Sequence, residues 1–496
     1  MTNSQLKVDH WPSTIDNSIM SSLSKSFNPT RTALGLGLFV GVTAVVGGII
    51  MAFGGPLAAV AVLLAVAAVV IVLRDIEVGF WGVIAVVCLL PFATLPFDIG
   101  LTPTFLDLAL AAVVGVWALG IVTGRQRTVI TAPVTLPILI FIFVALFAFI
   151  FGLNNGPLTP TLLRKFAEFL LSIGFVLVII DYCRTWERVE RLVKVILLVA
   201  AAASAVAIIL WLLPETTANS FLNMLTRLGY PGGWVIRYIE ENPELSERAI
   251  GTSVDPNSLG GLLLMMGALA GPQLVAKRPL FPHWLAWLIG LLIFVALILT
   301  FSRSAMLGLV AGLTFVAVTR YRRLLPYMLV VGLLILLLPI MQGYVGRFLE
   351  GFQGQDLATQ MRFGEYKDAF ILIQRYPLFG VGFAGTPDID IYLGVASVYL
   401  TIAQVMGLLG LAAFFAIILT VFGYAYFNRH NFKANERLDP VWLGLHAALV
   451  GALVAGVLDH YLFNLEFHHA VTIFWFFIGL ATAATRVGIA AAKSSE

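Results

Sequence analysis

Long apolar runs dominate this sequence and restrict its fold more than any other feature. A membrane-spanning helix needs about 20 apolar residues, and fourteen segments of the chain have a suitable length and composition. Hydrophobic residues make up 60% of the chain and charged residues 11%, which excludes a set of soluble domains. We therefore predict an all-α, multi-pass membrane protein. The predicted spans are 32–53, 55–73, 79–95, 104–123, 133–152, 161–182, 192–213, 256–275, 284–301, 304–319, 324–341, 397–427, 441–458 and 468–485.

The basic residues predict the orientation of these spans. If the N-terminus is cytoplasmic, 20 of the 30 lysines and arginines fall in predicted inner segments, as the positive-inside rule requires. Both termini are then cytoplasmic, and two long loops, 214–255 and 342–396, lie outside. We expect these loops to contain short amphipathic helices. Long ordered loops often carry function, so functional residues are expected there too. The third span is short and contains Pro91, so a re-entrant segment is an alternative there.

The rest of the composition limits the classes of site and partner. The first 31 residues are polar and predict a cytoplasmic tail rather than a cleavable signal peptide, which leaves 32–496 as one membrane domain. Cys88 and Cys183 are the two cysteines, so a disulfide framework and a cysteine-based zinc site are excluded. The basic residues form short clusters between apolar runs, which argues against a nucleic-acid partner. No cofactor or metal is indicated.

Arg303 lies between two apolar runs, in the segment TFSRSAMLGLVAG that begins at Thr300. An arginine near the membrane interior is costly and is usually kept for pairing or catalysis. Ser302 and Ser304 are small and polar, and they favour a tight hairpin that faces a cavity. The alternative is an arginine that extends to the lipid headgroups and anchors its helix.

Three further segments accompany this one: RAIGTSVDPNSLG from Arg248, MRFGEYKDAFILIQRYPLFGVG from Met361 and YLTIAQVMGLLGL from Tyr399. In order and spacing, the four together resemble the O-antigen ligase and O-antigen polymerase superfamily of bacterial membrane glycosyltransferases. The resemblance covers about residues 160–480, and the combination is more specific than any single motif. Because the ligases usually have twelve spans, twelve helices is the alternative to fourteen, with an extra N-terminal pair as the difference.

The resemblance implies a function. These enzymes transfer a glycan from an undecaprenyl-diphosphate carrier to an acceptor hydroxyl, without a metal, at the outer face of the bacterial cytoplasmic (inner) membrane. The implied partners are the lipid-linked donor, a glycan or lipid acceptor, and membrane lipids. Guanidinium groups suit a departing diphosphate because they are planar, permanently charged and bidentate.

Arg248 and Arg303 are therefore the predicted catalytic arginines. Asn257 is a predicted substrate-binding residue in the turn that leads into the eighth span, where a helix start offers backbone donors to phosphate. The alternative for Arg248 is an ion pair with Glu244 or Glu247 on a solvated loop.

Two more arginines are predicted substrate-binding residues. Arg362 begins a segment in which Phe363, Tyr366, Phe370 and Ile373 share one helical face, typical of a helix along the membrane surface. The alternative is a cover helix whose charges are simply hydrated.

Arg164 opens the sixth span, and Glu168 follows at a spacing that permits an ion pair on one helix face. We predict that Arg164 is a secondary phosphate ligand. A plain ion pair at the helix end is the alternative.

The general base departs from the family pattern. The resemblance implies a histidine shortly before the Tyr-Leu pair, but Ala396 stands there and cannot accept a proton. The absence of this histidine is compatible with a polymerase-like transfer, whereas it puts the assignment as a ligase in doubt. His460 and His468 are the predicted catalytic substitutes, although histidines at such positions also serve as interfacial anchors.

Asp388 and Asp390 are the remaining predicted substrate-binding residues. Their Asp-x-Asp spacing can hold a divalent cation in metal-dependent glycosyltransferases, or both can simply be solvated.

A membrane transporter or flippase, for a lipid-linked oligosaccharide or a small anion such as bicarbonate, is the alternative function. Such a protein needs charges near the middle of the bilayer and repeated or broken helices. Here the unusual charges gather at one predicted face, and the sequence has no clear internal repeat. The residues therefore favour a transferase.

Overall fold

The computed structural model describes residues 67, 70–95, 102–126, 128–337, 357–386, 395–433 and 435–493. The predicted tail, the first predicted span and nearly all of the second lie outside the described residues, as do Asp388 and Asp390. From Ala68 onward the chain forms one compact unit.

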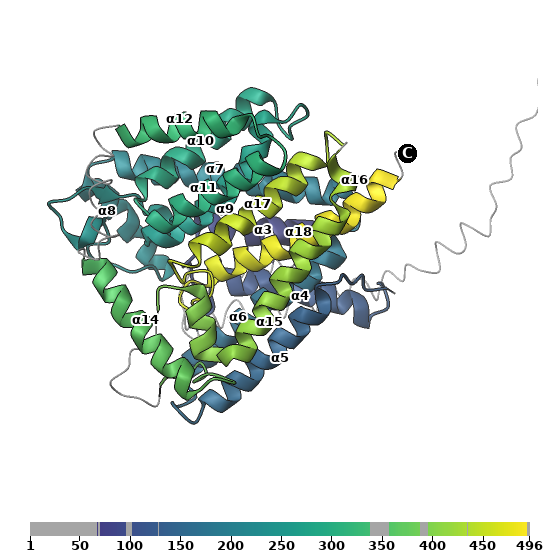
Figure 1. The fold of residues 1–496 in the computed structure, drawn as a ribbon. Helices are drawn as coiled ribbons and strands as arrows, with labels where there is room; N and C mark the ends of the chain where they lie inside the picture. The colour runs from purple at the N-terminus through teal and green to yellow at the C-terminus, as the bar shows by residue number, and fades with distance from the viewer. Residues whose placement is uncertain are drawn as a thin grey trace, which may run out of the picture. The chain divides into compact units, whose positions relative to one another are not determined.

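Each of the other predicted spans corresponds to a described helix (Figure 1). Six of these helices are long and apolar enough to cross a membrane, and several shorter ones are also apolar. The predicted all-α membrane class is confirmed, whereas the count of fourteen spans stays a prediction. The helices are α3 (Ile76–Leu89), α4 (Phe105–Val122), α5 (Thr135–Gly152), α6 (Pro160–Tyr182), α7 (Trp186–Leu212), α9 (Pro256–Val275), α10 (His283–Leu299), α11 (Arg303–Thr319), α12 (Leu324–Leu337), α15 (Val398–Asn428), α17 (Asp439–Ala455) and α18 (His468–Lys493).

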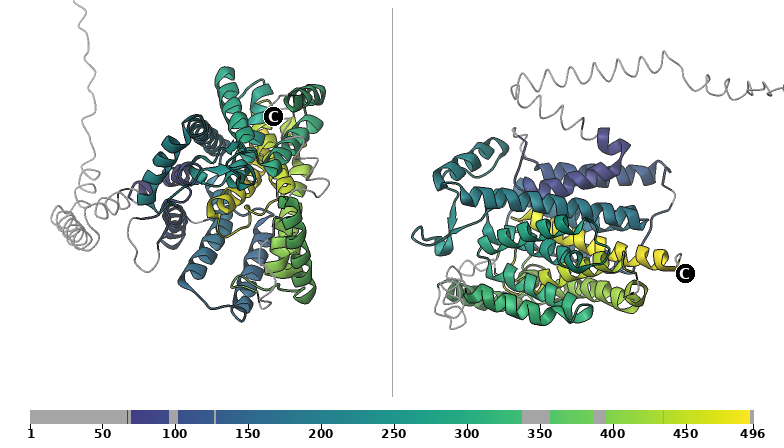
Figure 2. Two further views of the ribbon diagram at one scale, coloured as in Figure 1. Left: turned by 90° about the vertical axis from the view of Figure 1, so that its left-hand side faces the viewer. Right: turned by 90° about the horizontal axis from the view of Figure 1, so that it is seen from above.

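Seen from above, most of the long helices run side by side (Figure 2, right), whereas Figure 1 shows α5 and α15 inclined to α10 and α12. In Figure 1, α17 lies between α11 and α18, and it packs against α9 as well. Small residues allow the closest of these contacts, since a Cβ atom at Gly308 would lie 2.6 Å from the carbonyl oxygen of Gly451. Close backbone approach at small residues is the usual way in which membrane helices associate.

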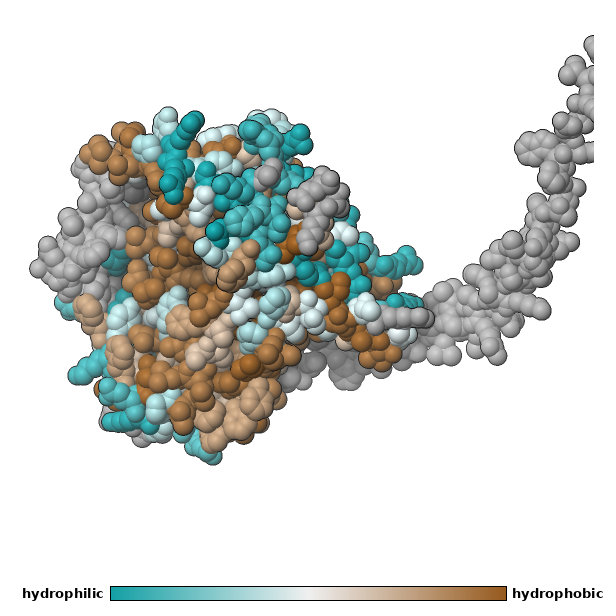
Figure 3. All heavy atoms as spheres, turned by 45° about the vertical axis from the view of Figure 1, so that its right-hand side comes forward, coloured by the Kyte–Doolittle hydropathy of each residue, from teal (hydrophilic) through white to brown (hydrophobic). Residues whose placement is uncertain are grey.

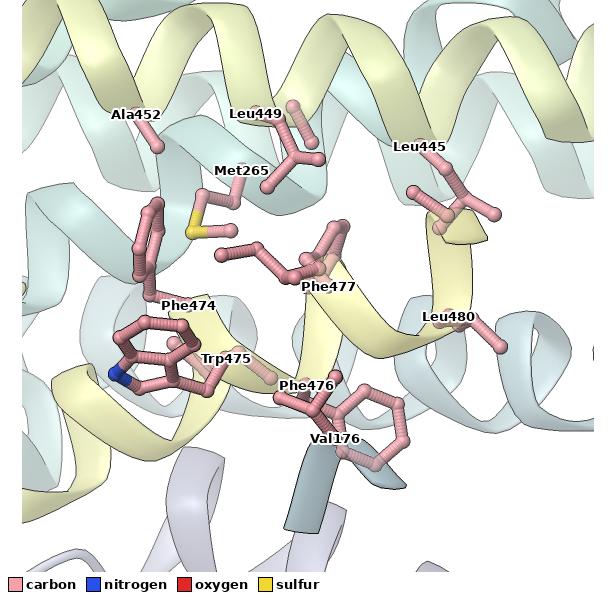
Figure 4. Close-up of a cluster of buried hydrophobic side chains, with 14 of the residues drawn as sticks. Val176, Met265, Leu445, Leu449, Ala452, Phe474, Trp475, Phe476, Phe477 and Leu480 are labelled. Atoms are coloured by element: carbon pink, nitrogen blue, oxygen red, sulfur yellow. The ribbon is translucent and has the colours of Figure 1, made fainter. Parts of the chain in front are cut away.

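Bulky side chains fill the space between α9, α17, α18 and α6 (Figure 4). Met265 and Leu449 face Phe474 and Phe477 there, and Trp475 beside them is fully buried. The first half of α18 is therefore packed against α6, α9 and α17.

Much of the face seen in Figure 3 is apolar, next to a hydrophilic region above it. Phe143 and Ile150 on α5 are 61% and 64% exposed, and Leu419 and Phe427 on α15 are 71% and 80% exposed. Soluble monomers rarely leave so much contiguous apolar surface in water. Contact with lipid explains these side chains.

The long loop before α9 is ordered. It contains α8 (Glu215–Met224), three short 3₁₀ turns and a small hairpin of β1 (Arg237–Tyr238) and β2 (Glu247–Arg248). Arg237 pairs with Arg248 and Tyr238 with Glu247 across this hairpin. A separate apolar cluster, which includes Leu222, Tyr230 and Ile236, holds the loop together.

The second long loop contains α14 (Leu357–Arg375), at the left edge of Figure 1, which packs on α15. The segment from Arg362 onward is helical, as the sequence predicts, and two phenylalanines of the predicted apolar stripe lie on its exposed side. Ala369 and Leu372 are fully buried, whereas Phe363 and Phe370 are 59% and 54% exposed. The small Ala369 permits close packing on α15, and the two phenylalanines are left for the lipid interface.

Helix α15 is interrupted near its start at Gly407, whose φ is +67°. The segment after α14 lies against the interruption and supplies hydrogen bonds: Val381 N donates to Gln404 O (2.8 Å), and Leu408 N donates to Pro377 O (2.7 Å). A break in a membrane helix is tolerated because neighbouring backbone satisfies the freed groups.

Candidate functional site

Arg248 connects the starts of two membrane helices. Its Nε donates to the carbonyl oxygen of Thr300 (2.8 Å), just before α11, and its Nη2 donates to Asn257 Oδ1 (2.7 Å) in the first turn of α9. The residue after β2 is held at the end of α10, because Ala249 N donates to Leu299 O (2.7 Å). The half-buried guanidinium is therefore held where the loop meets both helices.

The start of α9 is a capped helix N-terminus. Asp255 is its N-cap and accepts from Ser258 N (2.6 Å), and Pro256 is the first helical residue. Burial raises the pKa of Asp255; Asp459 adds to the rise, whereas Arg248 and the backbone N–H of Ser258 oppose it. Free N–H groups and the helix dipole at such an end favour an anion.

Arg303 is the first residue of α11, directly after a tight turn. Helix α10 ends at Leu299, and Phe301 has a φ of +51°, so three residues reverse the chain. This is the hairpin that the small polar residues predict. Ser302 N donates to Thr300 Oγ1 (3.2 Å), and Arg303 is half-buried. Arg248 and Arg303 thus flank the same turn.

Asp459, between α17 and α18, joins this group and was missed by the sequence analysis. Its Oδ2 accepts from Ser304 Oγ (3.2 Å), and its Oδ1 lies 3.5 Å from His460 Nδ1. Asp459 is 6% exposed, whereas the His460 side chain is 33% exposed. An Asp-His pair in a short turn between two apolar runs is the signal that could have revealed it.

Ala396, at the place of the implied histidine, lies between α14 and the Asp459 turn. Its N–H donates to Glu365 Oε2 (3.0 Å), and Tyr366 Oη donates to its carbonyl oxygen (3.3 Å). Val398 N donates to the carbonyl oxygen of Asp459 (3.1 Å). His460 is therefore next to the region that the missing histidine would occupy.

The Arg362 end of α14 belongs to the same electrostatic environment. Burial raises the pKa of Tyr366, Arg362 opposes the rise, and the carboxylates of Glu365 and Asp459 add to it. We call Arg248, Asn257, Arg303, Asp459 and His460 the helix-start cluster, with Arg362 at its edge.

One comparison with known proteins bears on this cluster. Residues 288–415 match the model of the Wzy_C family, described as O-antigen ligase. This part of the chain is therefore similar to the O-antigen ligase family. The match confirms the resemblance to the O-antigen ligase and polymerase superfamily and supports a glycosyltransferase-like membrane enzyme of cell-surface polysaccharide biosynthesis. No curated protein matches the chain.

The matched residues include Arg303 and Arg362, whereas Arg248, Asn257 and His460 lie outside the match. The structure brings residues from both sides of the match into one cluster. Hydrogen bonds from Arg248 to Asn257 and to Thr300, and from Ser304 to Asp459, make this connection.

Arg164 and His468 lie together at a second group of polar residues. Arg164 Nη1 donates to Thr102 O (2.8 Å) and is 3.1 Å from Glu168 Oε1. The His468 side chain is 9% exposed, and its Nδ1 is 3.4 Å from Asp107 Oδ1. Their phosphate-binding and catalytic roles stay predictions.

Proposed function

We propose that this protein transfers a glycan from an undecaprenyl-diphosphate carrier to an acceptor hydroxyl at the outer face of the membrane. The observation that supports it most directly is the position of Arg248. Hydrogen bonds to Thr300 and Asn257 aim this guanidinium at the adjoining starts of α9 and α11, beside Arg303.

The cluster suits a leaving diphosphate. When the bond between the sugar and the diphosphate breaks, negative charge grows on the phosphate oxygens. Arg248, Arg303 and the backbone N–H groups at two helix starts are fixed donors near that charge. One such preorganised donor lowers a barrier by about 3 kcal/mol.

His460 is the proposed general base. The acceptor hydroxyl gives its proton to the imidazole, its oxygen forms a bond to the anomeric carbon, and the lipid diphosphate departs with the electron pair. Asp459, whose Oδ1 lies 3.5 Å from His460 Nδ1, is the carboxylate proposed to orient the ring.

Lysine variants test the diphosphate assignment. Arg248→Lys and Arg303→Lys keep the charge but lose the bidentate geometry, so we expect each to lower the transfer rate about 100-fold or more. The assay uses purified protein and lipid-linked donor. Arg227→Lys, at an exposed residue of the same long loop, serves as the matched control and should keep the wild-type rate. Full activity of both cluster variants would refute the assignment.

The products separate a polymerase from a ligase. With Ala396 in place of the implied histidine, we favour a glycan acceptor, which yields a ladder of chain lengths. A single transfer onto a lipid acceptor, with no ladder, would assign the ligase reaction instead.

A transporter or flippase is the second candidate, because one observation favours it. Gln404 is 1% exposed, and both of its side-chain polar atoms lack a hydrogen-bond partner among the described residues, next to the interruption at Gly407. Broken helices with free polar groups are typical of transporter sites. Protein in sealed vesicles should show no movement of lipid-linked oligosaccharide if the transferase assignment is right.

A further inference from the structure

Three membrane helices each contribute one potential metal ligand to a single point. Asp107 lies in the first turn of α4, Glu168 lies in α6, and His468 is the first residue of α18. One ligand atom from each of the three lies within 4.8 Å of the others. None of these residues belongs to the helix-start cluster.

Each carboxylate presents its two oxygens to different groups. Glu168 Oε1 and Asp107 Oδ2 face Arg164, at 3.1 and 3.7 Å. The other oxygens, Asp107 Oδ1 and Glu168 Oε2, face His468 Nδ1 at 3.4 and 3.7 Å. The Arg164 guanidinium therefore offsets the negative charge on one oxygen of each carboxylate. The other oxygen of each carboxylate faces the His468 imidazole.

The hydrogen bonds around His468 determine which ring nitrogen carries the proton. Ser172 Oγ donates to the carbonyl oxygen of Glu168 (2.9 Å), so it must accept from His468 Nε2, 3.1 Å away. Thr472 Oγ1, 2.8 Å from Ser172 Oγ, can supply a second donor to this hydroxyl. In the neutral ring, Nδ1 then holds a lone pair rather than a proton.

This lone pair is directed at two carboxylate oxygens. Among the described residues, His468 Nδ1 and Asp107 Oδ1 have no hydrogen-bond partner, and the His468 side chain is 91% buried. A lone pair against two anionic oxygens is repulsive unless a positive charge lies between them. Distances of 3.4 and 3.7 Å are too long for a hydrogen bond that would place a proton there.

We propose that Asp107, Glu168 and His468 bind a divalent zinc ion. Zinc bonds of about 2.1 Å in tetrahedral geometry separate neighbouring ligand atoms by about 3.4 Å, close to the observed spacing. Ser172 and Arg164 form the second layer of contacts that metal-binding histidines and carboxylates need. Asp107 and Arg164 are partly exposed, which gives the ion a path from solvent.

The ion would fix the start of α18 to α4 and α6. The next residue, His469, lies 2.6 Å from Ser258 Oγ at the start of α9 through its Nε2. The zinc site would thus support the frame around the helix-start cluster, without taking part in glycan transfer. The inference stands whether or not the proposed transfer is correct.

The test measures metal content and stability of the full chain in detergent. Protein is stripped with a chelator, incubated with Zn²⁺ and desalted, and its zinc is counted by elemental mass spectrometry. We expect about one zinc per chain, a higher Tm with zinc than without it, and no such rise with Mg²⁺. Glu168→Gln and Asp107→Asn should lose the bound zinc, whereas His430→Asn, at an exposed histidine, should keep it.

A less disruptive variant provides a test if the carboxylate variants do not fold. Ser172→Ala removes only the partner of His468 Nε2 and should weaken zinc binding about 10–100-fold. Wild-type protein that takes up no zinc, with a Tm that chelation leaves unchanged, would overturn the proposal. That result would assign a proton shared by the two carboxyl groups in place of the metal. Zinc retained equally by Glu168→Gln, Asp107→Asn and wild type would overturn it as well.

Discussion

Asp459 uses its two side-chain oxygens to connect a helix start to a histidine. Oδ2 accepts from Ser304 Oγ, one residue beyond Arg303, and Oδ1 accepts from the backbone N–H of His460 (2.9 Å) while it faces the ring. The buried carboxylate thus connects the arginine side of the cluster with the proposed base. At the scale of single residues, this is the contact on which the proposed chemistry depends.

The first prediction at this scale concerns the proposed base. We expect His460→Ala to lower the transfer rate by about 100- to 10,000-fold, because it removes the acceptor of the hydroxyl proton. The measurement compares the transfer rates of purified wild type and variant with the same lipid-linked donor.

Asp459→Asn tests the positioning role separately. It should lower kcat with little change in KM and leave protein abundance normal. His283→Ala, at the exposed start of α10, serves as the control and should behave as wild type. A wild-type rate in His460→Ala would exclude this histidine as the base.

Glu247, next to Arg248, gives a second prediction at the residue scale. Burial raises the pKa of Glu247 to about 7, from a usual value of 4.5, and the Glu215 carboxylate adds to the rise. Between these values the folded state binds more protons than the unfolded state, so the free energy of unfolding falls as pH rises. We expect the loop hairpin to be less protected from amide hydrogen exchange at pH 8 than at pH 5.

Glu247→Gln should abolish this pH dependence, because the amide does not ionise. Glu244→Gln, at an exposed residue three positions earlier, provides the comparison and should retain it. Equal pH dependence in both variants would show that another group is responsible.

Helices α11 and α17 meet through glycine backbones rather than through large side chains. A Cβ at Gly308 would lie 2.6 Å from Gly451 O, and one at Gly312 would lie 2.7 Å from Ala447 O. Arg303 and Ser304 lie at the start of α11. The glycine contact therefore also sets their position along the helix axis relative to Asp459. Packing between elements therefore fixes the geometry of the cluster.

Substitution at this contact should separate the helices. We expect Gly308→Leu to destabilise the protein by about 1–3 kcal/mol or more, as overpacked cores do, and to lower the transfer rate as well. The same change at Gly423 in α15, where an added Cβ meets nothing within 4 Å, should leave the thermal transition almost unchanged. Equal transitions for the two variants would contradict the role assigned to the glycine contact.

At the scale of the whole molecule, the charges fall at two ends of the bundle. The helix-start cluster occupies one end, and the Arg320–Asp439 and Arg437–Glu190 ion pairs, with N···O distances of 3.0 and 2.6 Å, occupy the other. The sequence assigns Arg320 and Arg437 to the cytoplasmic side, so the helix-start cluster is predicted to face outward.

Labelling of single cysteines tests this orientation. Glu241→Cys, in the long loop before α9, should react with an impermeant thiol reagent on intact cells, and Glu436→Cys should react only after the membrane is opened. Both side chains are well exposed, at 69% and 44%, and the natural cysteines are buried, which keeps the background low. Protection of Glu241→Cys together with labelling of Glu436→Cys would reverse the topology.

The sequence by itself determined the membrane class and the positions of the described spans. The hydrocarbon core of a membrane requires long apolar helices, because a helix makes its backbone hydrogen bonds within itself. The composition and length of each apolar run show this locally in the sequence. The same local information made Arg248 and Arg303 candidate site residues, because each lies in a polar segment that interrupts the apolar pattern and resembles a family motif.

Only the tertiary structure decided which of these residues meet. Asp459 joins Ser304 from 155 positions away, and His468 meets Asp107 and Glu168 on two other helices. Apolar helices are equally soluble in lipid on every side, so hydrophobicity does not select their neighbours. Close fits such as Gly308 against Gly451 select them, and a fit between two surfaces is a property of the folded chain alone.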